Sequence, residues 1–149
     1  MKQRLILLLS GFVAWTLFFI LARALFLAYH GNLSAELSIA DIFLVFIHGI
    51  RMDFSMAGYF SLLPGLIFGL FYFAGGKGLW RFWFGYHAIV LFVASFIIVL
   101  DFELYKHWGF RLDATPLMYM GKEAAQSGDI GKSILLIIFC LVIYSAGLF

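Results

Sequence analysis

Apolar residues in this chain form runs that are long enough to cross a membrane. A transmembrane helix needs about 20 mostly apolar residues to cross a hydrocarbon core of about 30 Å. The stretch from Leu5 to Tyr29 meets this requirement, with Arg23 as its one charged residue. Lys2 and Arg4 precede it, as basic residues precede a signal peptide, and Ala22-Arg23-Ala24 would suit a cleavage site. Because the run exceeds the roughly 7–15 residues usual for the apolar region of a signal peptide, and because more apolar spans follow, we predict a retained first span.

The second apolar stretch, from Ala40 to Phe73, has an awkward length for a membrane protein. Its 34 residues would make a straight helix about 51 Å long, too long for one crossing. Pro64-Gly65 lies too close to one end to divide it into two spans. We predict one long, bent element, in which an amphipathic lead-in (about 41–53) continues into a span at 54–73. A broken pair of helices is the alternative.

The rest of the chain adds a third span, a polar segment and the start of a fourth span. We expect a short turn at 75–81, a span at 82–100 and a polar region at 101–132. Thr115-Pro116 predicts a short helix through about Gln126, held at the membrane surface. The 16 residues of 134–149 begin a span that is not yet long enough to cross. The predicted fold class is all-α: a multi-pass membrane domain of about four spans, the last incomplete, with an interfacial helical segment on the outer face.

Composition excludes an ordinary soluble domain. Apolar residues make up 64% and charged residues 12%, whereas a soluble domain has about 45–50% and about 25%. The net charge is +2 and the basic residues are scattered, so the sequence predicts no nucleic-acid partner. The single Cys140 excludes an intrachain disulfide, and the four histidines are too far apart in sequence for a local metal motif.

The basic residues of the short loops predict the orientation. Cytoplasmic loops carry an excess of lysine and arginine. Lys2 and Arg4 lie at one end of the first span, and Lys77 and Arg81 lie two crossings later on the same side. We therefore predict a cytoplasmic N-terminus, with 30–38 and 101–132 facing outward.

The most unusual local feature is the polar cluster in residues 48–54. At 100° per residue, His48 and Arg51 fall on one face of a helix together with Asp41 and Ser55, and Asp53 falls on the opposite side. Ionisable groups at membrane depth usually pair, face protein or line a wet cavity. The cluster fits a polar site near the outer surface, which binds a lipid headgroup or docks a further domain. A salt-bridged lead-in helix lying at the interface is the alternative, and the pattern favours it slightly.

A second polar cluster, at 101–113, follows the third span. Asp101 and Tyr105 are one helical turn apart, and Gly109 is expected to end the helix. Asp101 and Glu103 are two residues apart, so they point to different faces and do not suggest a catalytic acid pair. A plain amphipathic connector is the alternative. We predict no catalytic residue and no metal site in this chain, and the candidates for contact with a lipid headgroup or a docked domain are His48, Arg51, Asp53, Asp101, Glu103, Tyr105, Arg111 and Asp113.

These clusters resemble a known family. The sequence His48-Gly49-Ile50-Arg51-Met52-Asp53-Phe54-Ser55, followed by Gly58-Tyr59 and Leu63-Pro64, resembles the N-terminal membrane domain of lipoteichoic acid synthase-like proteins. Asp101, Tyr105, Arg111 and Asp113, followed by residues 117–121, resemble the segment after the third span of that family. The resemblance covers nearly the whole chain, in order and spacing.

The resemblance implies a membrane anchor in the bacterial cytoplasmic membrane. The family consists of sulfatase-like phosphoglycerol transferases of the alkaline phosphatase superfamily. Five spans precede an extracytoplasmic catalytic domain with a threonine nucleophile and a divalent metal, commonly manganese. That domain would lie beyond Phe149, so we expect this chain to be a fragment that holds no cofactor. Its expected partners are membrane lipid and its own catalytic domain.

Among the candidate contacts that the resemblance suggests, Arg51 and Arg111 are the best suited to phosphate, because a guanidinium can donate two hydrogen bonds to a phosphate group. The alternative function is a stand-alone small membrane subunit that binds a partner in the bilayer. Gly65 and Gly69 have the small-xxx-small spacing that lets a second helix approach closely, although packing within this chain uses the same spacing.

Overall fold

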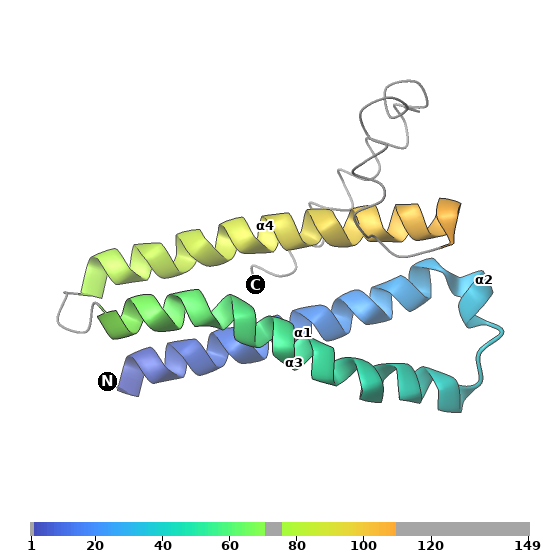
Figure 1. Cartoon of the computed structure of the whole chain (residues 1–149), viewed down its shortest axis with the longest axis horizontal. Coiled ribbons are helices and arrows are strands. Elements are labelled where there is room, and N and C mark those ends of the chain that lie inside the picture. The colour runs from blue at the N-terminus through green and yellow to red at the C-terminus, as the bar shows by residue number, and fades with distance from the viewer. Residues whose placement is uncertain (1, 71–75, 110–149) are drawn as a thin grey trace, which may run out of the picture. The chain divides into compact units, whose positions relative to one another are not determined.

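A computed structural model describes residues 2–70 and 76–109 of the chain. This part is helical and contains no strand: α1 is Lys2–Tyr29, α2 Gly31–Ser34, α3 Ile39–Leu70 and α4 Gly76–Trp108 (Figure 1). The all-α prediction is therefore confirmed for the described residues. The chain divides into two compact units, Met1–Phe84 and Gly85–Phe149, and each is considered by itself.

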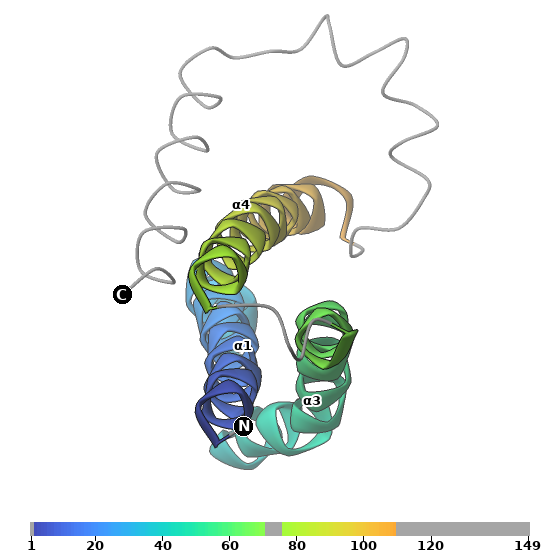
Figure 2. The same ribbon diagram turned by 90° about the vertical axis from the view of Figure 1, so that its left-hand side faces the viewer.

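The first unit is built on an antiparallel pair of long helices, α1 and α3. Arg4 at the start of α1 contacts Phe68 near the end of α3, and Arg23 late in α1 contacts Asp53 in the middle of α3. Figure 2 shows the two helices side by side. The buried residues are Gly11, Trp15, Thr16 and Phe18 on α1, and Asp53, Ala57, Pro64 and Phe68 on α3. Apart from Thr16, they are three, four or seven positions apart, which places them on one face of each helix.

Aromatic side chains fill the middle of this pair. The Trp15 ring lies 4.8 Å from the Phe60 ring in an edge-to-face arrangement, and 5.6 Å from the Phe18 ring in the same geometry. Such contacts favour packing beyond the burial of area alone. Trp15 is only 3% exposed, so it is the central anchor between α1 and α3.

Short polar contacts organise the turn between α1 and α3. The Ser34 hydroxyl of α2 donates to the Leu27 carbonyl, which is one of the last carbonyls of α1. Ser38 and Asp41 form a capping box at the start of α3: the Asp41 carboxylate accepts from the Ser38 hydroxyl at 2.7 Å and backbone N–H at 3.1 Å, and the Ser38 hydroxyl accepts from the Asp41 N–H. These hydrogen bonds, the hydroxyl one above all, hold the pKa of the exposed Asp41 carboxyl below its ordinary value.

α3 is a single helix of 32 residues with Pro64 inside it. Proline removes one backbone hydrogen bond, but Pro64 is buried and the helix continues past it to Leu70. Figure 2 shows that α3 is curved along its length. The described part of the 40–73 stretch is therefore one bent element and not a broken pair of helices.

α4 differs from the sequence prediction at its start. Residues 76–81, expected to form a turn, are the first part of the helix. The Trp83 ring stacks on Phe68 at 5.5 Å, which gives this early part of α4 a packing partner on α3. At the other end the prediction is confirmed: Gly109 has φ +73° and its N–H donates to the Tyr105 carbonyl, so it ends α4.

Two described helices are long and apolar enough to cross a membrane, Lys2–Tyr29 and Gly78–Lys106. In the first, only 17% of the most apolar window is buried, whereas the core helix of a soluble protein is mostly buried. The predicted helix at 115–126 and the predicted span at 134–149 lie outside the described residues. Four spans were expected, and the described part of the chain supplies two candidates.

Candidate functional site

A buried ion pair joins α1 to α3. Two nitrogens of the Arg23 guanidinium donate to the two carboxylate oxygens of Asp53, at 2.6 and 2.8 Å. This two-bond geometry is the strongest arrangement of an arginine and a carboxylate. The side chain of Arg23 is 19% exposed and that of Asp53 is 6% exposed, so water screens the pair little.

Gly49 provides the space for this ion pair. It lies one helical turn before Asp53 on α3, and a β-carbon at this position would collide with the Arg23 guanidinium. The guanidinium therefore lies directly over the α3 backbone, where any larger side chain would displace it. By contrast, a β-carbon at Gly58 of the same helix would meet nothing within 4 Å.

The position of the pair along α1 explains why Arg23 needs a partner. Arg4 and Arg23 are 19 residues apart, about 28 Å along a helix, which is close to the thickness of a hydrocarbon core. An arginine near the edge of an apolar layer is costly unless it pairs or reaches water. Asp53 supplies the opposite charge. Because the two partners lie on helices that pack against each other, the pair fixes the register between α1 and α3.

The structure divides the sequence-predicted cluster of 48–54 into two sets. His48 and Arg51 are exposed on α3, while Asp53 is buried against α1. His48 contacts the Leu44 carbonyl through Nδ1 at 2.9 Å, and this keeps its ring along its own helix. Both carboxylate oxygens of Asp53 are engaged by Arg23, so Asp53 serves the α1–α3 contact rather than the exposed face.

The second cluster belongs to the second unit. Asp101 is buried, at 6% exposed, and Glu103 and Tyr105 are half-buried on the last turns of α4. Arg111 and Asp113 lie outside the described residues. The described part of the chain holds no group of three or more His, Cys, Asp or Glu side chains that could bind a metal ion.

Sequence reasoning missed Arg23 and Gly49 as site residues. The sequence analysis treats Arg23 as an interruption of an apolar run and as part of a possible cleavage site, although an arginine at that depth requires a partner. Before residue 100 the chain has three acidic residues, Glu36, Asp41 and Asp53, of which Asp53 alone lies in the interior of a long apolar stretch. The spacing of Gly49 and Asp53, one turn apart, was the second available signal.

The glycines that sequence reasoning selected play a lesser part. A β-carbon at Gly65 would lie 3.9 Å from a methyl group of Leu8 on α1, an ordinary contact, and one at Gly69 would meet nothing within 4 Å. Gly65 therefore faces α1, within this chain, without an unusually close approach of the two backbones.

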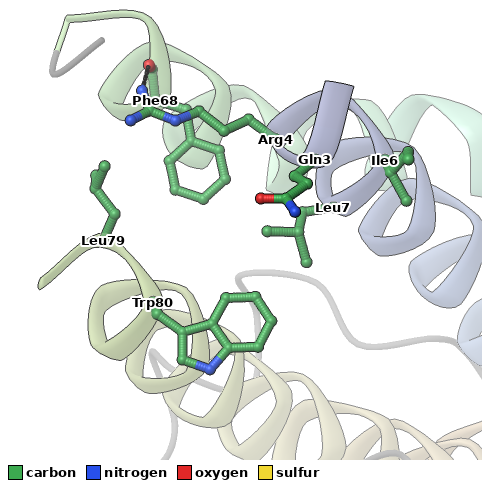
Figure 3. Close-up of a pocket in the computed structure, with 7 residues that line it drawn as sticks. All are labelled: Gln3, Arg4, Ile6, Leu7, Phe68, Leu79 and Trp80. Carbon is green, nitrogen blue, oxygen red and sulfur yellow. Dashed lines mark hydrogen bonds between the residues drawn. The ribbon is translucent and has the colours of Figure 1, made fainter. Parts of the chain in front are cut away.

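The opposite end of the α1–α3 pair carries a second polar contact. Arg4 donates from Nη1 to the Phe68 carbonyl at 3.2 Å. Phe68 lies in the last described turn of α3. Beside this contact lies a cavity between α1, α3 and the start of α4 (Figure 3).

Comparisons of the chain with known protein families, with curated proteins and with solved structures found no match.

Proposed function

We propose that this chain is the membrane anchor domain of a sulfatase-like transferase that moves phosphoglycerol or phosphoethanolamine groups. The anchor would lie in a bacterial cytoplasmic membrane with its N-terminus inside and about four spans in this chain. Its substrate would be lipid-linked and held at the outer face. The metal-dependent chemistry would belong to a catalytic domain outside this chain.

The proposal rests on one observation. The motif at 48–55, which carries the resemblance to the family, lies in the part of α3 that contains Asp53, the partner of Arg23 in the buried ion pair. Gly49 and Asp53 hold Arg23, while His48 and Arg51, in the same two turns, stay exposed. A helix that served only as a hydrophobic tether would need neither the glycine nor the buried charges. The arrangement supports a defined polar surface at this end of the first unit.

This surface suits the recognition of an anionic lipid headgroup or of the catalytic domain. The Arg51 guanidinium can donate two parallel hydrogen bonds to a phosphate group. The Arg23–Asp53 pair fixes the backbone that carries Arg51, so that the exposed side chain starts from a constant position. An anchor also keeps a catalytic domain at the height of a lipid-borne substrate and raises their effective concentration.

The packing of α1 supports its retention as a span. A signal peptide is removed after translocation, and cleavage near residues 22–24 would take away or expose Arg23. Removal of α1 would take away both the partner of Asp53 and the helix against which the buried face of α3 packs.

The first test of the proposal is the mass of the native protein. Protein purified from its own membrane should give tryptic peptides that continue past residue 149 into a soluble domain with sulfatase-like metal ligands. A native mass equal to this chain would instead favour the small membrane subunit and remove the transferase proposal.

A second test addresses Arg51. In the full-length enzyme, Arg51→Ala should lower transferase activity about tenfold, as expected for the loss of one charge-assisted contact, without lowering the amount of protein in the membrane. Arg81→Ala is the matched control, because Arg81 is also exposed but lies at the other end of the first unit. A parallel fall of activity and protein level in Arg51→Ala would mean that Arg51 acts in folding and not in recognition.

A further inference from the structure

The exposed residues His48 and Arg51 of α3 lie at the depth of lipid phosphate groups. In a bilayer that α1 crosses, Asp53 lies level with its partner Arg23, near the edge of the hydrocarbon core. At about 1.5 Å per residue, Arg51 lies about 3 Å and His48 about 7 Å beyond Asp53, on the side away from the core. The headgroup layer is about 5–7 Å thick on each side of a bilayer. Both side chains therefore start from within that layer.

The side chains of these two residues share one face of α3. They are three positions apart, and residues at this spacing are neighbours on a helix surface. The face points away from α1, because Asp53 occupies the opposite face, which meets Arg23. Leu44 and Met52, 48% and 70% exposed, lie one turn before and one turn after His48. The two basic side chains therefore have an exposed apolar border.

A hydrogen bond determines which nitrogen of the His48 ring carries the proton. Nδ1 lies 2.9 Å from the Leu44 carbonyl oxygen, and a carbonyl oxygen only accepts, so Nδ1 carries the hydrogen. In the neutral ring, Nε2 is then an acceptor without a hydrogen, in a side chain that is exposed. Nε2 donates to a phosphate oxygen only after the ring takes up a second proton, which histidine does between about pH 5 and 8.

The carboxylates of the first unit are engaged or distant from this pair. Both oxygens of Asp53 accept from Arg23, on the α1 side of the helix. The Asp41 carboxylate accepts from Ser38 and lies seven residues, about 10 Å, before His48. Glu36 precedes the start of α3. The other ionisable side chains that α1 and the residue after it bring to this end are Arg23, Tyr29 and His30.

We propose that His48 and Arg51 bind the phosphate of one anionic phospholipid, and that this binding takes up a proton on His48. The Arg51 guanidinium donates to both free phosphate oxygens, and the protonated Nε2 of His48 donates to one of them. Leu44 and Met52 lie against the glycerol and the first part of an acyl chain. The inference rests on the proposed function and deepens it, since it names a lipid phosphate as the ligand of this surface and makes its binding depend on pH.

The direction of the pH dependence follows from this proton. An anion favours the charged form of a neighbouring imidazole, so the lipid binds the protonated ring more tightly than the neutral ring. Affinity should therefore rise as the pH falls from about 8 to about 5.5, the range in which histidine gains its charge. The expected gain is about tenfold, as for one added charge-assisted hydrogen bond.

The test is binding of short-chain lipids by the whole chain, purified in a neutral detergent and measured by microscale thermophoresis. Dihexanoylphosphatidylglycerol should bind about tenfold more tightly at about pH 5.5 than at about pH 8. At the lower pH it should also bind more tightly than dihexanoylphosphatidylcholine, in which the choline group balances the phosphate charge.

Two variants separate the roles of the two residues. His48→Gln keeps a polar side chain that gains no charge, so its affinity should stay at the high-pH value throughout. Arg51→Gln should weaken binding about tenfold at both pH values, as expected for the loss of a charge-assisted contact.

His30→Gln and Arg81→Gln are the matched controls. His30 is a buried histidine next to the end of α1, and Arg81 is an exposed arginine at the other end of the first unit. Both variants should keep the affinity of the unmodified chain and its dependence on pH. Circular dichroism of each variant checks that the helices remain.

Four results would overturn the proposal. A pH dependence that survives in His48→Gln, or that disappears in His30→Gln, would assign the proton to another group. Equal binding of the two lipids at the lower pH would mean that the pair does not select an anion. Full competition by soluble glycerol phosphate would mean a site for a free phosphate.

The fourth result is the absence of lipid binding by the chain while Arg51→Ala still lowers the activity of the full-length enzyme. It would mean that this surface docks the catalytic domain. The proposed function would stand after any of these four results, because the peptides of the native protein beyond residue 149 decide it independently.

Discussion

Substitution of Gly49 by alanine offers the sharpest test of the packing between α1 and α3. In an ordinary helix interior, alanine is more favourable than glycine by about 0.5–1 kcal/mol. At Gly49 the added methyl group would occupy the position of the Arg23 guanidinium. The structure therefore predicts a change of the opposite sign from the one that helix propensity predicts.

The magnitude follows from the ion pair that the methyl group displaces. Removing one partner of a buried pair costs about 3–5 kcal/mol. In Gly49→Ala both charges remain and can meet in a poorer geometry, so roughly half of that cost, about 2 kcal/mol, applies. Subtracting the gain in helix propensity leaves a net destabilisation of about 1 kcal/mol.

The assay is equilibrium unfolding in mixed micelles of a mild detergent and dodecyl sulfate, followed by circular dichroism. Gly58→Ala on the same helix is the matched control, since its β-carbon would meet nothing within 4 Å. It should be neutral or stabilising by up to about 1 kcal/mol. The two alanine variants should therefore differ by about 2 kcal/mol in free energy of unfolding.

A change of background gives a second, independent check. When Arg23→Leu and Asp53→Leu are introduced together, no guanidinium lies over Gly49, and Gly49→Ala should become neutral or stabilising. The coupling between the two sites should be about 2 kcal/mol. If Gly49→Ala behaves like Gly58→Ala in the unmodified chain, the guanidinium does not lie against α3 and the reasoning is wrong.

Two further outcomes are expected from the first unit. Asp53→Asn leaves the Arg23 charge without a carboxylate, so it should lower the free energy of unfolding by about 3 kcal/mol in the same micelle assay. The double variant Arg23→Leu/Asp53→Leu should stay within about 1 kcal/mol of the unmodified chain. Equal losses in the two variants would refute a specific ion pair. The pKa of Asp41 is lowered in the folded chain. Its capping box should therefore stabilise the start of α3 to the full extent at any pH above the ordinary carboxyl pKa of about 3.9. This stabilisation should be lost as the pH falls through the lowered pKa of Asp41. Ser38→Ala should raise the pKa of Asp41 toward the ordinary value in a carbon-13 NMR titration, and an unchanged midpoint would contradict the role of these hydrogen bonds.

The local features of the helices follow from the amino-acid pattern alone. Long apolar runs predicted α1, most of α3 and most of α4, because only a helix satisfies its own backbone in an apolar setting. Gly109 was recognised as the end of α4, since glycine adopts positive φ at no steric cost. The helical period also placed Asp53 opposite His48 and Arg51, and the burial of Asp53 follows this division. Residues 76–81 were predicted wrongly as part of a turn, because Gly76 and Gly78 suggest one and the sequence does not reveal the packing of Trp83 on Phe68.

Which side chains meet across the interface between helices depends on the tertiary packing. The period of a helix says which face a residue occupies, but the partner across the interface depends on the register of two helices, which is set by their whole packed surfaces. The pairing of Arg23 with Asp53, 30 residues away, arises in this way. So does the need for glycine at position 49, which reflects a side chain from another helix and not the local backbone. The cavity beside Arg4 likewise exists only because α1, α3 and the start of α4 converge, and no pattern within any one of these segments predicts it.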